Sequence, residues 1–461
     1  MTILAAFAVP HPPIILEEVG GGQEKQIEKT INAYREVMNR IAALRPDTVV
    51  LISPHSVLYA DYFHISPGAE AVGNLRHFGA AEVKIKAVYD QAFVYKLSQI
   101  AIKCGIPAGT QGERDKALDH GTIIPLYYLN EVYQGYQLVR LGLSGLSPLD
   151  HYRLGKCISE AAAELNRRTV VIASGDLSHK LKADGPYGFA AEGWQFDEQV
   201  TKALSHGDFL SLLAIEPKLV EAAGECGLGA LQIMAGALDQ KAVTSELLSY
   251  EGPFGVGYAV ASFMVTGEDQ ERCFDLQFQR VEQQKLSEQK SAEDEYVRLA
   301  RLALETYIIT GQRVELPANL SPQMLLERAG VFVSLKKYGQ LRGCIGTIAP
   351  TTSSVAQEIL HNAVCAAVED PRFNPVTASE LTELSYSVDV LGEAEKIDSS
   401  AQLDVERYGV IVQAGRRRGL LLPNLEGVDS VEQQIVIAKQ KAGIANDESA
   451  QLFRFEVVRH K

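Results

Sequence analysis

The chain has 461 residues, of which 46% are hydrophobic and 22% charged. This composition excludes a mainly disordered chain, and at about 100–200 residues per domain the length predicts two or three domains. The net charge of −14 argues against a nucleic-acid-binding surface. No apolar run reaches the roughly 18 residues that a membrane span needs, so we predict neither a nucleic-acid nor a membrane partner.

The first residues and the cysteines favour a cytoplasmic protein. Met1–Val9 is apolar, but no basic residue precedes it and Pro10-His11-Pro12-Pro13 ends it. A signal peptide has a basic start, so this segment predicts a first β-strand instead. The six cysteines are scattered without a Cys-x-x-Cys pair, which argues against a disulfide framework or a zinc ribbon and favours a reducing cytoplasm.

Strands and helices alternate through the first part of the chain. Apolar runs predict strands, and apolar residues at helical spacing predict helices. The predicted strands are residues 2–9, 47–53, 136–144 and 168–174, and the predicted helices are residues 24–44 and 147–166. This alternation predicts an α/β sandwich with a largely parallel central sheet. Because Ser147 and Asp150 resemble a helix capping box, we expect His151 to be a surface residue of its helix and not a ligand.

A polar junction follows. Residues 268–295 hold nine acidic and four basic residues and are rich in glutamine. The alternation of Phe274, Leu276 and Phe278 predicts an edge strand, and the stretch after it predicts a solvated linker or an exposed helix. We therefore predict a first domain over residues 1–267, a junction over residues 268–291 and a second domain over residues 292–461.

The second domain is predicted to be smaller and of the α+β class. Ser291 with Asp294 is expected to cap its first helix. The other expected strands are residues 330–336, 385–391 and 409–413, and the other expected helices are residues 355–368 and 431–441. Arg416-Arg417-Arg418 lies between two glycines and predicts a solvated hairpin tip.

Four of the ten histidines occur where a strand has just ended or a loop turns: His11, His55, His120 and His179. Loops at the carboxyl ends of parallel strands converge on one crevice, where α/β proteins bind ligands. Any one of these histidines alone is more typical of a hydrogen-bonding loop residue. Their joint placement, with a carboxylate, indicates a site for a divalent transition metal.

The first 265 residues or so resemble the class III extradiol dioxygenase superfamily, which includes the LigB-type catalytic subunits and the MEMO proteins. Six short motifs carry this resemblance in the family's order. They are Pro10-His11-Pro12-Pro13, Ser53-Pro54-His55, Asp119-His120-Gly121-Thr122, Ser174-Gly175-Asp176-Leu177-Ser178-His179, Glu225-Cys226-Gly227 and Gly257-Tyr258-Ala259.

The resemblance implies a non-haem Fe(II) held by two histidines and a glutamate. His11 and His55 match the metal histidines, and Glu225 lies where the dioxygenases place the glutamate. MEMO proteins have a cysteine in that region, and Cys226 is the next residue, so both assignments stay open although we favour Glu225. Since imidazole also binds zinc and copper, those metals are alternatives to iron.

The same resemblance assigns the acid–base chemistry. His179 matches the acid–base histidine, and His120 matches a second histidine that lines the substrate pocket. A histidine near its unperturbed pKa of about 6.5 can take a hydroxyl proton and return one. Asp176 either orients His179 or belongs to a simple turn after a strand. The expected substrate is a small catechol-like aromatic diol.

Residues 292–461 resemble the AMMECR family. The motifs are Leu341-Arg342-Gly343-Cys344-Ile345-Gly346-Thr347 and Glu369-Asp370-Pro371-Arg372-Phe373-Asn374-Pro375. Arg342, Cys344 and Arg372 form a candidate second site, where a thiolate or an anion-binding role is conceivable. In the structural alternative, the glycines shape a tight turn and Cys344 packs inward as a small apolar residue.

Two functions follow from these resemblances. The first is an Fe(II)-dependent extradiol-type dioxygenase fused to an AMMECR domain. The alternative is a metal-binding adaptor that does not cleave rings. The two domains together resemble the AmmeMemoRadiSam set of bacterial proteins, which implies a radical-SAM protein as a partner.

Overall fold

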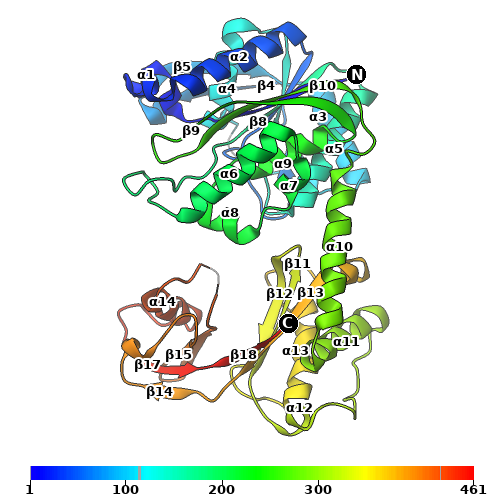
Figure 1. Cartoon of the computed structure of the whole chain (residues 1–461), viewed down its shortest axis with the longest axis vertical. Coiled ribbons are helices and arrows are strands. Elements are labelled where there is room, and N and C mark those ends of the chain that lie inside the picture. Colours follow the sequence, from blue (N-terminus) through cyan, green and yellow to red (C-terminus); the bar gives the residue numbers. More distant parts are fainter. Residues whose placement is uncertain (1, 113–115, 426) are drawn as a thin grey trace. The chain divides into compact units, whose positions relative to one another are not determined.

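The computed structural model describes residues 2–112, 116–425 and 427–461. The chain forms two compact units, the first ending at Gln279 and the second beginning at Arg280 (Figure 1). Among the described residues, none of the helices combines the length and the apolar character that crossing a bilayer requires.

A six-stranded sheet forms the centre of the first unit. Its strand order is β7 (Gln137–Leu141), β2 (Thr48–Ile52), β8 (Thr169–Ser174), β1 (Ile3–Val9), β10 (Tyr258–Glu268) and β9 (Lys241–Glu251). The first four strands run parallel, and β10 and β9 add an antiparallel edge. The predicted α/β sandwich with a largely parallel sheet is therefore confirmed. All residues of β2 and β8 are buried, as expected where helices cover both faces.

Helices cover the two faces of this sheet. The helices α2 (Glu28–Leu44) and α4 (His120–Val132) share one apolar core with β1, β2 and β8. On the opposite face, α5 (Pro148–Glu164) packs against α9 (Leu228–Ala237), which contacts β8. The other elements of this unit are α1 (Glu17–Gly20), β3 (Phe63–His64), β4 (Glu70–Leu75), β5 (Ala80–Val88), α3 (Gln91–Lys103), β6 (Ala108–Gly109), α6 (Ala191–His206), α7 (Phe209–Leu213) and α8 (Pro217–Ala223).

The junction becomes helical at Phe274, so the edge strand predicted over Phe274, Leu276 and Phe278 is wrong. Residues Phe274–Ala292 form α10, in which Phe274 and Phe278 are buried while Leu276 is exposed. A spacing of four residues places the two phenylalanines on one helical face, and the same spacing also fits a strand. The apolar side of the helix ends soon after Phe278, and the rest is polar, in line with the exposed helix that was the alternative to a linker.

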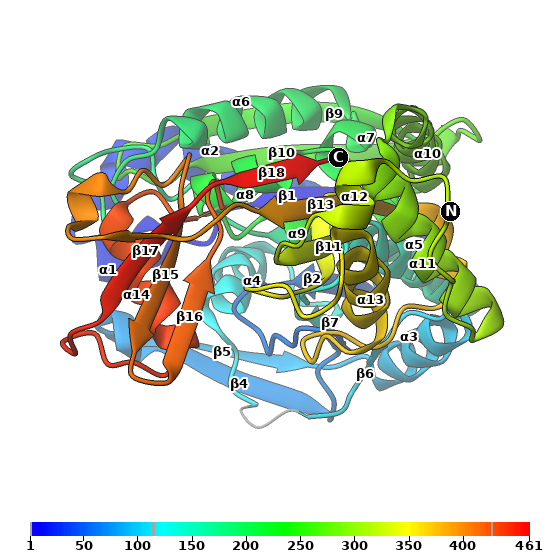
Figure 2. The ribbon, with the colours of Figure 1, turned by 90° about the horizontal axis from the view of Figure 1, so that it is seen from below.

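The second unit contains two four-stranded sheets (Figure 2). The first has the order β12 (Gln340–Gly346), β11 (Val331–Lys337), β13 (Leu384–Leu391) and β18 (Val457–His460). The second has the order β14 (Glu395–Ile397), β17 (Gln451–Phe455), β15 (Gly409–Ala414) and β16 (Arg417–Leu421). The helices are α11 (Glu295–Thr310), α12 (Pro322–Leu326), α13 (Val355–Val368) and α14 (Val431–Lys441).

The predicted α+β class of this unit is confirmed. The helices α11 and α13 share a core with the first sheet, and α14 packs on β15 and β16. One detail of the prediction was wrong: Ser291 lies inside α10, and Asp294 alone caps α11 by accepting hydrogen bonds from the amides of Tyr296 and Val297. The Arg416-Arg417-Arg418 segment is exposed at the tip of the β15–β16 hairpin, as predicted, with Arg416 in the turn and the other two at the start of β16.

Candidate metal centre

The parallel sheet gathers three of the predicted histidines at one edge. His11 follows β1, His55 follows β2, and His120 is the first residue of α4. The ring centroids of His11 and His55 lie 4.8 Å apart, and those of His55 and His120 lie 4.0 Å apart. His11 is buried and His55 is exposed, so the group formed by His11, His55 and His120 is open to solvent on the His55 side.

Hydrogen bonds fix the tautomer of His11. The Ser174 hydroxyl donates to the carbonyl oxygen of Gly121 at 2.6 Å, and Ser174 Oγ also lies 3.0 Å from His11 Nδ1. Because a hydroxyl has one hydrogen, His11 Nδ1 must be the donor in the second contact. Burial, reinforced by His55, lowers the pKa of His11 to about 3, so its ring is neutral. The Nε2 lone pair of His11 therefore points away from Ser174 and toward the group.

Cys226 completes a set of three donor atoms. Its Sγ lies 3.7 Å from His11 Nε2, and His55 Nε2 lies 3.0 Å from the same nitrogen. One ligand atom from each of these three residues falls within 4.8 Å of the others. Two imidazoles and a thiol at these separations fit a divalent transition metal, since nitrogen and sulfur are donors that zinc, copper and iron accept. The residues present therefore fit a bound metal.

The Glu225 carboxylate lies elsewhere, although the sequence favoured it as the third ligand. Its Oε2 accepts a hydrogen bond of 2.6 Å from the amide of Leu228, at the start of α9. Burial raises the pKa of Glu225 to about 7. The geometry thus brings Cys226, the alternative that stayed open, to the two histidines.

Asp176 holds the backbone of the site. Its Oδ1 accepts a hydrogen bond of 2.8 Å from the amide of His11, and its own amide donates to the Cys226 sulfur at 3.4 Å. Burial raises the pKa of Asp176 to about 6, although the bond from His11 acts in the opposite direction. Asp176 therefore connects the turns that carry His11 and Cys226, and its influence on His179 is electrostatic.

His179 lies beside this group and is covered by an aromatic ring. Tyr187 stacks on it with a centroid distance of 5.0 Å. Burial lowers the pKa of His179, while the nearby Asp176 acts to raise it. The ring is consequently neutral near pH 7 and can accept a proton. Tyr187 was missed by the sequence analysis because it lies in an irregular loop with no motif.

His120 owes its position to a charged pair. Asp119 caps α4 by accepting a hydrogen bond of 3.0 Å from the amide of Thr122, and the Ser53 hydroxyl donates to the same carboxylate. Arg140 Nη2 lies 3.2 Å from Asp119 Oδ2. Burial alone would raise the pKa of Asp119, but Arg140 and these hydrogen bonds lower it. Burial, with His55 and His11, lowers the pKa of His120 to about 3.

Arg140 is the buried partner that sequence reasoning missed. It lies in β7 and is only 2% exposed. A signal was present, because Arg140 is the single charged residue in the otherwise apolar run Leu138–Leu143. A charge inside a buried strand requires a partner, and the motif that contains Asp119 supplies it.

His151 differs from the prediction in one respect. The capping box of Ser147 and Asp150 is present, and His151 Nδ1 lies 3.0 Å from the carbonyl oxygen of Ser147. However, His151 is buried against the ring of Phe63 and is not a surface residue. The face of α5 that carries it turns toward β3 and not toward solvent.

The candidate second site is held together by its backbone. Asp370 Oδ2 accepts a hydrogen bond of 2.9 Å from the Cys344 amide, and Arg372 Nη2 donates to the Cys344 carbonyl oxygen at 3.2 Å. Arg372 also forms a two-pronged ion pair with Asp370. These contacts provide hydrogen-bond partners for the Cys344 amide and carbonyl on the free edge of β12, as a neighbouring strand would.

The side chains of this region have structural partners as well. Arg342 pairs with Glu380 through two hydrogen bonds of 2.9 and 3.1 Å, away from Cys344. The Ser334 hydroxyl donates to the Cys344 sulfur at 3.2 Å, and burial raises the pKa of this thiol. A Cβ on Gly343 would lie 2.1 Å from the Ala366 carbonyl oxygen, so only glycine fits there. The structural alternative accounts for these contacts.

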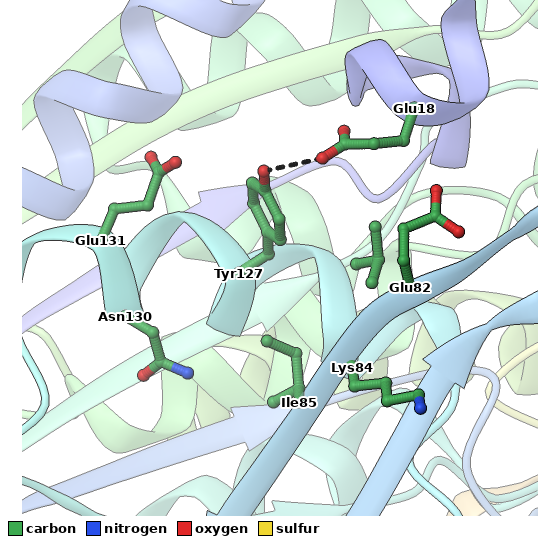
Figure 3. A pocket seen from close by; sticks show the side chains of 8 residues that line it. Glu18, Glu82, Lys84, Ile85, Tyr127, Asn130 and Glu131 are labelled. Carbon is green, nitrogen blue, oxygen red and sulfur yellow. Dashed lines mark hydrogen bonds between the residues drawn. The ribbon is translucent and has the colours of Figure 1, made fainter.

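The first unit also has a surface pocket (Figure 3). It is lined by residues of α1, β5 and the second half of α4, and Tyr127 donates a hydrogen bond of 3.2 Å to Glu18 across it. Its lining contains no histidine or cysteine. The candidate metal ligands His11, His55 and Cys226 are therefore not part of this pocket.

Comparison with known proteins assigns both units. Residues 5–261 match the family described as the catalytic LigB subunit of aromatic ring-opening dioxygenase, and residues 297–460 match AMMECR1. Protein CA_C1420 of Clostridium acetobutylicum is 39% identical over 469 residues and aligns along all of both chains. A protein of Thermotoga maritima is 46% identical over 171 residues, which cover 37% of this chain and 98% of that protein.

Two solved structures are also similar to parts of the chain. The uncharacterized protein PH0010 of Pyrococcus horikoshii is 35% identical, with a TM-score of 0.34, and covers 36% of this chain and 88% of that one. The uncharacterized protein JW3007 of Escherichia coli K12 is 17% identical, with a TM-score of 0.39, and covers 57% of this chain and 99% of that one. By the match over more than half its length, the chain belongs to the family of catalytic LigB subunits of aromatic ring-opening dioxygenases, here joined to an AMMECR1 domain.

Proposed function

We propose that the first unit is a metal-dependent dioxygenase that opens catechol-like aromatic diols. The observation that supports this most directly is the convergence of His11, His55 and Cys226 beside two further neutral histidines. The first three residues would hold the metal, with iron as the metal that the reaction requires. Bound Fe(II) would supply the positive charge that holds the deprotonated diol and the electrons that activate O₂.

The donor set explains how the charge would be balanced. Burial raises the pKa of Cys226 well above its ordinary value, so the thiol is neutral without a metal. A divalent ion next to the sulfur would displace this proton, because coordinated thiols lose theirs. A thiolate and two neutral imidazoles then carry the same single negative charge as the carboxylate set expected from the sequence.

His179 would act as the acid–base residue. Its ring is neutral near pH 7, and it lies close enough to His55 and Asp176 for their charges to act on its pKa. If a metal held by His11, His55 and Cys226 bound the diol, the neutral imidazole of His179 could accept the proton of its second hydroxyl and later return it. His120, whose ring centroid lies 4.0 Å from that of His55, would line the substrate pocket.

The test is an oxygen-uptake assay. The protein is loaded with Fe(II) without air, the bound iron is quantified, catechols are added, and air is admitted. The expected result is one O₂ consumed per ring opened, with a yellow product. His179→Gln should retain iron and lose at least about 100-fold in turnover, as expected for an acid–base residue. Bound iron without oxygen uptake by any diol contradicts the proposal.

A second function is favoured by one observation, the presence of Cys226 in the donor set. The MEMO proteins have a cysteine in this region, and we propose as the alternative a metal-binding adaptor that works with a radical-SAM protein. Co-purification of such a protein, dependent on His55 and Cys226 and without diol turnover, would support the adaptor. Turnover of a diol without such a partner would favour the enzyme.

A further inference from the structure

Arg140 has more hydrogen-bonding capacity than the protein uses. One of its terminal nitrogens, Nη2, contacts Asp119, while Nε and Nη1 are buried and have no partner among the described residues. A guanidinium group has five N–H donors and no acceptor. Buried donors without partners cost about 1–3 kcal/mol each, more when charged, so such atoms call for a missing partner.

Serine hydroxyls on the same side of the sheet are also unpartnered. The Ser66 amide donates to the Arg140 carbonyl oxygen at 3.0 Å, and Ile65 pairs with Leu141 in antiparallel fashion. Residues opposite each other in antiparallel strands point to the same face, so the side chains of Ser66 and Arg140 are neighbours. Ser66 Oγ is buried without a partner among the described residues.

Ser56 extends this group toward the metal-binding donors. Its Cβ lies 3.6 Å from where a Cβ on Gly142 would be, and Gly142, the residue directly after β7, is two residues beyond Arg140. Ser56 Oγ is likewise buried and unpartnered among the described residues. Because Ser56 directly follows His55, these unused donors adjoin the metal centre.

We propose that Arg140, Ser66 and Ser56 form a buried oxyanion-binding subsite that receives a carboxylate or phosphate group of the ligand at the metal centre. The three side chains offer N–H and O–H donors, and such donors with a cation fit an oxyanion. This inference rests on the proposed function, since that places the ligand at the metal.

Access to this subsite requires movement of a surface segment. Residues 57–62 directly follow Ser56, none of them is fully buried, and they contain no helix or strand apart from one bridge between Tyr59 and Ser144. Their displacement would open the subsite without disturbing the sheet. The covered position of Arg140 then excludes water from the oxyanion once it is bound, which strengthens each charged hydrogen bond.

Calorimetric titration tests the subsite without any turnover. The protein, both metal-free and loaded with redox-inert Zn(II), is titrated with benzoate and with inorganic phosphate. We expect binding of at least one anion, tighter when Zn(II) is present. Binding of benzoate alone assigns a carboxylate ligand, and binding of phosphate alone assigns a phosphate ester.

Variants of the subsite and a control variant outside it show whether the anion binds at Arg140. Arg140→Lys keeps the positive charge beside Asp119 but removes Nε and Nη1, and it should weaken anion binding at least about 10-fold, as loss of a charged hydrogen bond does. Ser66→Ala should weaken it less, and Arg153→Met, in α5, should leave it unchanged. If Arg140→Lys fails to fold, Ser66→Ala and Ser56→Ala carry the test.

Absence of anion binding in both metal states would overturn the subsite, as would affinities in Arg140→Lys and Ser66→Ala equal to that of the unchanged protein. Either failure is separate from that of the proposed function, which is decided by metal binding and oxygen uptake. A protein that opens neutral catechol but binds no anion would retain its activity and lose only the subsite.

Discussion

The two units carry one distinctive cysteine each, and the two cysteines are used differently. Cys226 lies beside the imidazoles of His11 and His55, and neutral His11 directs the lone pair of its Nε2 toward the sulfur. Cys344 lies in an edge strand whose amide and carbonyl are bound by Asp370 and Arg372. The first arrangement leaves donor atoms available for a ligand, whereas the second uses its polar groups to hold the chain. A distinctive motif can thus mark either a ligand-binding site or a purely structural contact. The two are distinguished by whether the polar groups of the motif already have hydrogen-bond partners within the protein.

The largest expected effect concerns the third metal ligand. Cys226→Ala should weaken binding of Zn(II) or Fe(II) by more than about 100-fold, above the 10- to 100-fold cost typical of residues that only orient ligands. Glu225→Gln should change the affinity less than about 3-fold, because its carboxylate binds the Leu228 amide. Calorimetry with both metals measures this. Loss of binding in Glu225→Gln with retention in Cys226→Ala would reverse the assignment.

A substitution beside the cysteine of the second unit should instead change the stability of that unit and leave metal binding intact. Asp370→Asn breaks the ion pair with Arg372 and should lower the free energy of unfolding of this unit by about 1.5–3 kcal/mol, the value of hydrogen bonds to charged groups. Guanidinium denaturation gives the change. Metal affinity measured on the same sample serves as the control, and a parallel loss of metal would contradict the separation of the two cysteines.

Lowering the pH should reduce the stability of the folded protein, because the neutral histidines of the candidate metal centre resist protonation. His120 has a pKa of about 3 in the folded protein, below the unperturbed value of about 6.5. The unfolded chain then binds the proton first, so this residue's contribution to stability is lost as the pH falls from about 6.5 toward 3. The unchanged protein should lose up to about 1.4 kcal/mol per pH unit relative to His120→Gln over this window.

Denaturation of both metal-free proteins at pH 7, 6 and 5 measures the difference. Using the difference between the two proteins removes the opposing contributions of Asp176 and Glu225, whose pKa values are raised. A difference that does not vary with pH would show that His120 is not held neutral.

The smallest effect is expected at the hairpin tip of the second unit. Arg416 is exposed in the turn between β15 and β16. Arg416→Ala should change the free energy of unfolding by no more than about 0.5 kcal/mol, as for most surface substitutions. A larger loss in denaturation experiments would show that this arginine has a partner.

Much of the fold could be read from hydrophobic periodicity. The bounds of α13 and α14 agree with those predicted, because apolar residues at helical spacing lie between clear capping residues, Ser354 and Ser430. The buried strand β2 was evident from its apolar run. The start of α10 was not, because only two buried phenylalanines define its pattern, and their spacing fits a helix and a strand equally.

The sequence was enough to predict that the histidines meet at one edge of the sheet. It was not enough to predict which atoms face one another there. Glu225 and Cys226 are adjacent, and which of them points to the histidines depends on the path of the backbone at a helix start, where one residue turns the chain by about 100°. The roles of Ser174 and Arg140 depend on contacts between segments distant in sequence. The apolar run around Arg140 marks a buried charge, but no local pattern identifies the partner of either residue.

The helix α10 sets practical limits on dividing this protein for study. Its residues Phe274 and Phe278 are buried, and the first compact unit ends at Gln279, inside the helix. A first unit truncated at residue 267 would lose these phenylalanines along with Asp275, which binds Lys156 of α5. Expression of the LigB-family half alone should therefore extend to about residue 292, and a separately expressed AMMECR1 half can begin at Glu293, whose carboxylate binds Arg301.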